Sequence, residues 1–265
     1  WKPMVEAVRI ISIGLGGDSE VRFSGKTGLE VGPRRVVPLS LLGQLYTYTT
    51  ERLNQQLQGS PSRGNNRFAL PLEHNDALMK SCGALELKAW ELLAQGPVEL
   101  EAIVGTDREL ARAIARLERK GMVIYSGFTP SDAAHVLGMC DHWCVETAKL
   151  AALVWARQMR HVYGLGRCQE GYAASPSRHV FERVFQLISR VLIEAGLHQH
   201  RRLDQADARS LTSLLADLVF ESSEAPGRML ESGSLFHLKF AADYPLVGVG
   251  APAGTFFPDA AQHLG

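Results

Sequence analysis

The chain has 265 residues, of which 46% are hydrophobic and 21% are charged, a composition typical of a globular protein with a substantial core. Its 28 lysines and arginines balance its 28 aspartates and glutamates, which excludes a general electrostatic attraction to nucleic acid or membranes. Four cysteines are too few for a disulfide scaffold, and the sequence shows neither a signal peptide nor an apolar run that would span a bilayer. We therefore expect a cytoplasmic protein with no membrane partner.

Residues 1–50 are predicted to be rich in short strands. The β-branched run at 8–13 is typical of a buried strand, and the glycine-rich stretch 14–19 breaks it. Residues 20–23 alternate like a return strand, and a second turn precedes a third strand at 29–33. We interpret this region as a β-meander with glycine-rich turns.

Residues 51–82 are predicted to form a linker, because they are polar and carry Gly, Ser, Pro and Asn clustered at 59–66. Residues 83–128 then predict a compact unit of three helices and a strand, at 84–95, 98–105, 108–120 and 122–128. This order of elements is the pattern of a winged helix-turn-helix.

Within that unit, the apolar spacing predicts which helical side chains face the core. Leu87, Trp90 and either Leu92 or Leu93 share one face of the first helix. The third helix is expected to be capped by Thr106 or Asp107, to end at Gly121 and to bury Leu110, Ile114 and Leu117.

Residues 129–265 are predicted to be helical at first and mixed later. A cap at Thr129 or Ser131 with Pro130 in the first turn starts a short helix, and two long amphipathic helices follow at 142–164 and 177–200. A third helix over 204–223, a strand at 234–240 and a glycine-rich strand and turn at 244–254 complete the pattern. The expected fold class is therefore mixed α/β.

Five stretches of the sequence, in this order, resemble proteins of the hydantoinase/oxoprolinase family. They are "ISIGLGGDSEVR" at 11–22, "LEVGPRRVVP" at 29–38, "TPSDAAHVLG" at 129–138, "WCVETAKLAA" at 143–152 and "VGVGAPAG" at 247–254. The resemblance leaves out roughly residues 45–128, where the winged-helix unit would be an insertion.

The resemblance implies part of an actin-like, ribonuclease H-like ATPase fold interrupted by that insertion. It implies an enzyme that uses ATP with Mg to open or carboxylate a small cyclic amide, such as a 5-oxoproline-like ring, or a ketone. Members of the family bind ATP between two lobes and often work beside a partner subunit.

The sequence also departs from that family. Its two Asp-x-Gly-Gly-Thr phosphate hairpins are absent from these residues, and the chain opens on Trp1 rather than Met. We therefore expect a fragment that lacks the N-terminal lobe and is inactive alone, with no catalytic residue to assign.

Two glycine-rich stretches are candidate nucleotide contacts. Gly16, Gly17, Asp18 and Ser19 would offer backbone N–H groups to an anion, or would only form a hairpin turn. Asp18 stands where the family has a third glycine. The second stretch lies within 247–254. Its small residues would let a base or ribose approach the backbone, or would only allow tight packing. The resemblance favours an adenosine contact for Gly248, Gly250, Ala251 and Pro252.

Cys140, His142 and Cys144 invite a metal interpretation, which the spacing does not favour. Structural zinc takes four ligands, commonly from two Cys-x-x-Cys pairs, and no second pair is near in the sequence. On a helix, Cys140 and Cys144 would share a face from which His142 points away. We therefore predict no metal site.

A basic stripe on the third helix of the winged unit supports an alternative function. Phosphate contacts on DNA would come from one face of this helix, which carries Arg108, Arg112, Arg116 and Arg119. Glu109, Glu118 and Asp107 dilute the stripe, so a solvated helix face or a protein-docking module is the competing interpretation. A DNA-binding or protein-docking regulator with a ligand-binding helical domain remains open, although nucleic acid is not the expected partner.

Overall fold

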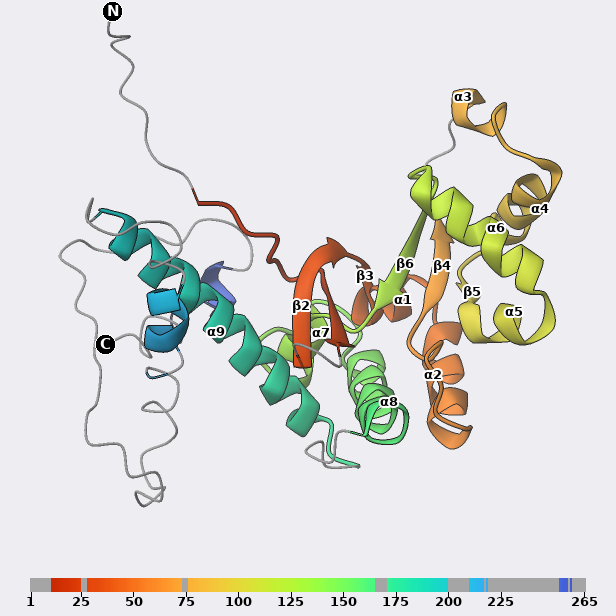
Figure 1. Cartoon of the computed structure of the whole chain (residues 1–265). Coiled ribbons are helices and arrows are strands. Elements are labelled where there is room, and N and C mark those ends of the chain that lie inside the picture. Colours follow the sequence, from red (N-terminus) through yellow and green to blue (C-terminus); the bar gives the residue numbers. More distant parts are fainter. Residues whose placement is uncertain are drawn as a thin grey trace, which may run out of the picture. The chain divides into compact units, whose positions relative to one another are not determined.

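The computed structural model describes residues 11–24, 28–72, 76–164, 171–199, 210–216, 218, 253–256 and 258. The chain divides into a larger compact unit, residues 15–181, and a smaller one that holds residues 11–14 and the described residues from 182 onward. Helices and small sheets alternate along the chain, so the fold is mixed α/β as expected (Figure 1). None of the described helices has the length and apolar character that a membrane span requires.

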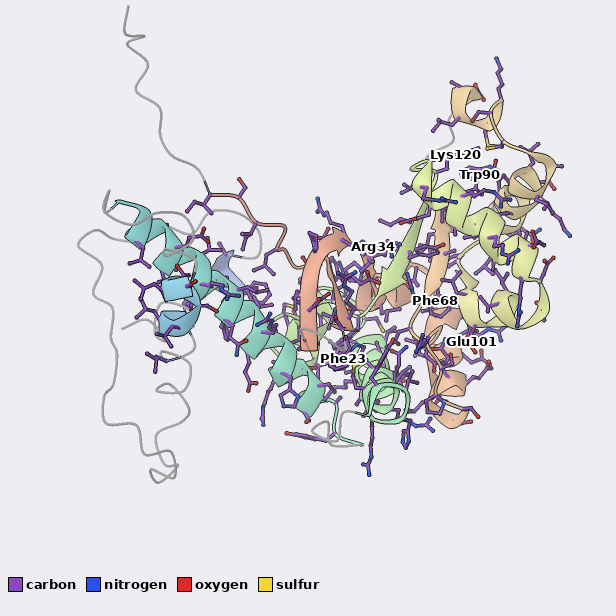
Figure 2. The ribbon with its side chains drawn as sticks, viewed as in Figure 1. Phe23, Arg34, Phe68, Trp90, Glu101 and Lys120 are labelled. Carbon is purple, nitrogen blue, oxygen red and sulfur yellow. The ribbon has the colours of Figure 1, made fainter. Side chains whose placement is uncertain are left out.

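The first sheet is a hairpin of β1 (Ser19–Ser24) and β2 (Gly28–Arg35). The strands are antiparallel, and Val21 lies opposite Val31. The next pair across the strands is Arg22 and Glu30, which form an ion pair of 2.8 Å. At the far end, the Phe23 ring meets the Tyr163 ring with centroids 5.5 Å apart (Phe23 is labelled in Figure 2). The predicted return strand and third strand are therefore confirmed as one hairpin.

The predicted buried strand at 8–13 is wrong for the residues that can be checked. Residues 11–15 have no regular structure, and Ile13 is 46% exposed; residues 8–10 lie outside the described residues. A β-branched run becomes a strand only when a neighbouring strand satisfies its backbone groups. None of the described strands pairs with 11–15.

The second sheet has the strand order β3-β6-β4-β5. Its strands are β3 (Val37–Pro38), β4 (Phe68–Pro71), β5 (Val98–Glu99) and β6 (Val123–Gly127). β3 runs parallel to β6, whereas β4 is antiparallel to both β6 and β5. The sheet therefore pairs strands that are between 29 residues (Ala69 with Val98) and 89 residues (Val37 with Ser126) apart in the sequence.

Helices lie on two sides of β4 and β6 in Figure 1. On one side are α1 (Leu39–Leu45), α7 (Pro130–Val136) and α8 (Val145–Tyr163), with α2 (Tyr48–Gln58) packed on α8. On the other side are α4 (Ala84–Leu93), α5 (Leu100–Thr106) and α6 (Arg108–Arg119), preceded by the short α3 (Asp76–Met79). The last long helix is α9 (Ala174–Gln199), and in the smaller unit Ile193 and Ala216 share a small apolar core.

The linker predicted at 51–82 is corrected by the structure, because this segment contains most of α2, all of β4 and α3. The polar cluster at 59–66 is exposed at Gly59, Ser60 and Arg63 but ends in two buried residues, Asn65 and Asn66. Asn66, only 3% exposed and with φ of 64°, donates its side-chain amide to the Ala151 carbonyl and its backbone N–H to Gln56. These hydrogen bonds of Asn66 hold the turn that ends the cluster. The boundary between the two compact units lies near residue 181 instead.

The unit predicted at 83–128 has the expected helices. Asp107 caps α6 by accepting the Leu110 N–H at 3.0 Å, and Gly121 follows the helix with φ of 72°. A common core buries Trp90, Leu93, Leu110, Ile114 and Leu117. Leu87 was expected in this core but is 36% exposed, because the face of α4 that meets α6 is centred on Ala89, Trp90 and Leu93.

Candidate functional site

The Gly16–Ser19 loop, a candidate nucleotide contact, is closed by its own hydrogen bonds. The Gly16 N–H donates to Ser19 Oγ at 2.9 Å, and the Ser19 N–H donates to the Gly16 carbonyl at 3.1 Å. The loop leads into β1 but does not connect two strands. Two of the amides that would face an anion are therefore already used.

The same loop is fastened to two other segments. The Asp18 carboxylate forms an ion pair of 2.5 Å with Arg35 at the end of β2, and the Ser131 N–H donates to the Gly17 carbonyl at 2.9 Å. A Cβ at Gly17 would lie 2.5 Å from Ser131 Oγ, so any larger residue here would require the Ser131 side chain to move. The geometry favours a structural turn at these residues, with Asp18 held by Arg35.

The second candidate stretch, with Gly248, Gly250, Ala251 and Pro252, lies outside the described residues. Its assignment to the adenosine side of a nucleotide site stays a prediction.

The motif residues of the larger unit meet at the buried carboxylate of Asp132. Its side chain accepts the backbone N–H groups of Leu39 at 3.2 Å, Ser40 at 2.7 Å and Thr129 at 3.0 Å. It also accepts the hydroxyls of Ser40 at 2.6 Å and Thr129 at 2.8 Å. One carboxylate therefore caps the N-termini of both α1 and α7, which begin about ninety residues apart.

Burial acts against this ionised group. Loss of water raises the pKa of the Asp132 carboxyl, and the hydrogen bonds from Ser40, Thr129 and Leu39 oppose that rise. Both Asp132 carboxylate oxygens accept hydrogen bonds, and three of the donors are backbone N–H groups. The surrounding structure therefore requires a side chain at this position that accepts hydrogen bonds.

Further backbone hydrogen bonds join the neighbouring motifs to this junction. The Val21 N–H donates to the Phe128 carbonyl at 2.9 Å, and the Cys144 N–H donates to the Ser40 carbonyl at 3.2 Å. Together with the contact between Gly17 and Ser131, these bonds connect four of the five family-like stretches: 11–22, 29–38 (through the adjoining Leu39 and Ser40), 129–138 and 143–152. We call this set of contacts the motif junction.

The basic stripe on α6 is largely paired with acidic groups. Arg112 forms an ion pair of 2.5 Å with Glu109, and Arg116 lies 3.1 Å from the Glu86 carboxylate of α4. Lys120, just beyond α6, also pairs with Glu86 at 2.7 Å (Lys120 and, on α4, Trp90 are labelled in Figure 2). Arg108 and Arg119 remain on the exposed face. Glu118, which dilutes the stripe in the sequence, pairs with Arg34 of β2 at 2.7 Å.

Glu86 is held in its charged form by these neighbours. Hydrogen bonds from Lys120, the Gly83 backbone and Arg116 lower the pKa of its carboxyl to about 2. Its side chain is only 8% exposed. One shielded carboxylate on α4 is therefore paired with two cations, Arg116 of α6 and Lys120 just beyond α6.

The strand that follows α6 does not turn back as a hairpin. β6 runs to Gly127, and α7 begins at Pro130. The antiparallel neighbour of β6 is β4, which precedes the three helices in the sequence. The position where a hairpin wing would project is thus occupied by the connection to the motif junction.

The Cys140–Cys144 segment is not helical, contrary to the geometry assumed from its spacing. α7 ends at Val136, and Cys144 is the residue that precedes α8. The structure instead brings Cys140 and His142 beside His135 of α7, which the sequence analysis did not single out. Burial is the main cause that raises the pKa of the Cys140 thiol.

Two further features, a cluster of arginines around Tyr125 and a pocket beside α2, could not be predicted from the sequence. The guanidinium groups of Arg34 and Arg67 lie 5.1 Å and 5.0 Å from the Tyr125 ring centroid, with Glu20 3.7 Å from each (Arg34 is labelled in Figure 2). A pocket of about 280 Å³ lies between α2, β5 and α5, with Tyr48 and Phe68 in its lining. None of the predicted site residues lines that pocket.

Comparison of the chain with protein-family models, with curated proteins and with solved structures found no match.

We predict that Asp132→Ala will lower the free energy of unfolding by about 3 kcal/mol or more, because it leaves three buried backbone donors without an acceptor. Ser40→Ala, which removes one hydroxyl donor, should cost about 1 kcal/mol. Denaturant unfolding followed by circular dichroism measures both. The exposed Asp141→Ala is the matched control, expected within about 0.5 kcal/mol of wild type. A loss under 1 kcal/mol for Asp132→Ala would contradict this role.

We also predict an acid-dependent loss of stability that depends on Glu86. Its folded pKa of about 2 is below the ordinary 4.5, so the unfolded chain binds a proton more readily as pH falls between these values. The stabilisation is therefore present above pH 4.5 and is lost toward pH 2. Glu86→Gln should flatten this part of the pH profile of unfolding, whereas Glu91→Gln, an exposed change on the same helix, should leave it unchanged. Identical profiles for wild type and Glu86→Gln would disprove the assignment.

Proposed function

We propose that this chain is part of an ATP-dependent enzyme of the hydantoinase/oxoprolinase kind, which acts on a small cyclic amide or a ketone. The observation that carries the proposal is the motif junction: four stretches that resemble this family, up to about 130 residues apart, are joined by hydrogen bonds in one place. The architecture that we propose is part of an actin-like, ribonuclease H-like lobe, in which residues 83–128 are a winged-helix-like insertion.

The chemistry of such an enzyme defines what this chain contributes. ATP with Mg would supply the phosphoryl group that converts an unreactive amide or enol oxygen into a leaving group. The junction residues engage one another through Asp132, Ser40 and Thr129, so they shape the lobe and do not perform the reaction. The phosphate-binding hairpins and the catalytic groups then come from another lobe or from a partner subunit, and this chain alone is inactive.

The insertion fits a protein-docking role better than DNA recognition. Arg112, Arg116 and Lys120 have carboxylate partners, which reduces the positive charge that phosphate binding requires. The strand after α6 leads into the motif junction, so no hairpin wing follows α6 to reach a nucleic-acid backbone. The exposed faces of α4 and α5 carry Leu85 and Val104, which are 41% and 51% exposed.

The test of the enzyme proposal is to extend the coding sequence upstream and assay the longer protein. We expect two Asp-x-Gly-Gly-Thr hairpins in the added sequence and ATP hydrolysis that increases with a cyclic amide such as 5-oxoproline or hydantoin. The 265-residue chain, assayed in parallel, should hydrolyse no ATP above background. The proposal would be refuted if the upstream sequence lacks such hairpins and no candidate partner subunit gives ATP hydrolysis when it is mixed with this chain.

A DNA-binding regulator is the second candidate, favoured by the exposed Arg108 and Arg119 on α6. An electrophoretic shift assay with genomic DNA fragments over a salt series separates the two candidates. If the chain is part of the enzyme, we expect no salt-sensitive complex. A complex that weakens with salt and is lost in the double variant Arg108→Ala with Arg119→Ala would establish the regulator instead. The variant Arg63→Ala with Lys149→Ala, which alters two exposed cations away from α6, controls for general loss of positive charge.

A further inference from the structure

We infer that His135, Cys140 and His142 form a binding site for a thiophilic divalent cation of the zinc class. One ligand atom from each residue lies within 4.8 Å of the others. The three donors come from two segments, since His135 is in the last turn of α7 and the other two are in the loop before α8. Gly138, with φ of 74°, turns the chain so that this loop returns over the end of α7.

The hydrogen bonds of His135 fix which ring nitrogen is available. Its Nδ1 is 2.7 Å from the Ser131 carbonyl oxygen, which only accepts, so Nδ1 carries the proton. Nε2 then presents its lone pair toward the loop. A ring N–H held by a backbone carbonyl is the arrangement that orients metal-binding histidines. His135 is 1% exposed, so the ring is fixed by packing as well.

The groups around Nε2 define the other ligands and the structural change that binding requires. Cys140 Sγ lies 3.2 Å from Nδ1 and 3.8 Å from Nε2, so the thiol must shift toward the Nε2 side of the ring to share a cation with it. The His142 ring centroid is 4.7 Å from that of His135. The Nε2 lone pair now accepts the Trp143 N–H at 3.1 Å. A bound cation takes the place of that N–H, so the Trp143 backbone must rotate while its indole, stacked on His135 at 5.4 Å, changes its environment.

The donor set fits zinc and cobalt better than calcium or magnesium. A thiolate and two imidazoles are soft and borderline ligands, whereas the harder cations prefer oxygen. Three protein ligands leave one tetrahedral position for water or an exogenous ligand. His142 is exposed, so the ion has a route from solvent. Bound there, it would fasten the loop between α7 and α8.

Cobalt titration of the metal-free 265-residue chain tests this inference. We expect a near-ultraviolet thiolate-to-cobalt charge-transfer band with visible bands of a tetrahedral site, both removed by excess zinc, and a change in Trp143 fluorescence that is absent in Trp143→Phe. Cys140→Ser should lose the charge-transfer band. His142→Ala, a change at an exposed side chain, should weaken binding by about tenfold or more and retain the circular dichroism spectrum of wild type.

Two cysteines outside the cluster provide matched controls. Cys82→Ser and Cys144→Ser should bind cobalt with the wild-type spectrum, because neither thiol belongs to the cluster. No charge-transfer band in the wild-type chain would overturn the inference. A band that survives Cys140→Ser but disappears in Cys144→Ser or Cys82→Ser would also overturn it.

Discussion

The larger unit depends on one buried carboxylate with five hydrogen-bond donors. Each helix N-terminus presents backbone N–H groups without partners, and both α1 and α7 place theirs around Asp132. Both helices also direct the positive ends of their dipoles toward this carboxylate. Burial makes the negative charge costly, and the surrounding donors offset that cost. Two other contacts adjoin this carboxylate. β3, which pairs with β6, ends at Pro38 directly before Leu39, and Ser131, which contacts the Gly17 loop, directly precedes Asp132.

This arrangement explains how the chain accommodates the three-helix unit. Ser40 and Thr129 are held together by Asp132, so the long segment between them leaves and returns at one place. Within that segment, β4 pairs with β6 and extends the sheet, while Glu86 joins α4 to α6 through Arg116 and Lys120. The three-helix unit thereby has its own apolar core, while its Glu118 pairs with Arg34 of β2 outside the unit.

Local patterns predicted some of this structure well. The periodic apolar residues of α6, its Asp107 cap and the stop at Gly121 depend on neighbours in sequence, as does the Thr129 cap of α7. The predictions that failed concerned segments whose structure depends on contacts with residues far away in the sequence. Ile11 and Ile13 look like a strand but no described strand pairs with them, and the polar turn at Asn66 looks like a linker but bonds to Ala151.

The candidate sites show the same division. The glycine-rich turn at Gly16–Ser19 was predicted from its residues, and its role as a nucleotide contact stays a prediction; its hydrogen bonds to Ser131 and Val36 could only be found in three dimensions. His135 was missed because a histidine in an apolar helix turn has no sequence mark; its meeting with Cys140 and His142 depends on how the loop turns at Gly138. A search for ligands across helix ends, and not only at fixed spacing, would have included it.

Native-state hydrogen exchange at the Asp132 junction tests the central claim most directly. If the carboxylate holds α1 and α7 together, the amides of Ser40 and Thr129 exchange as slowly as those in the buried middle of α8, through global unfolding. In Asp132→Asn both amides should exchange faster together, while the Leu110 amide, capped by Asp107, should be unchanged. Rapid or independent exchange of Ser40 and Thr129 in the wild-type chain would contradict the account.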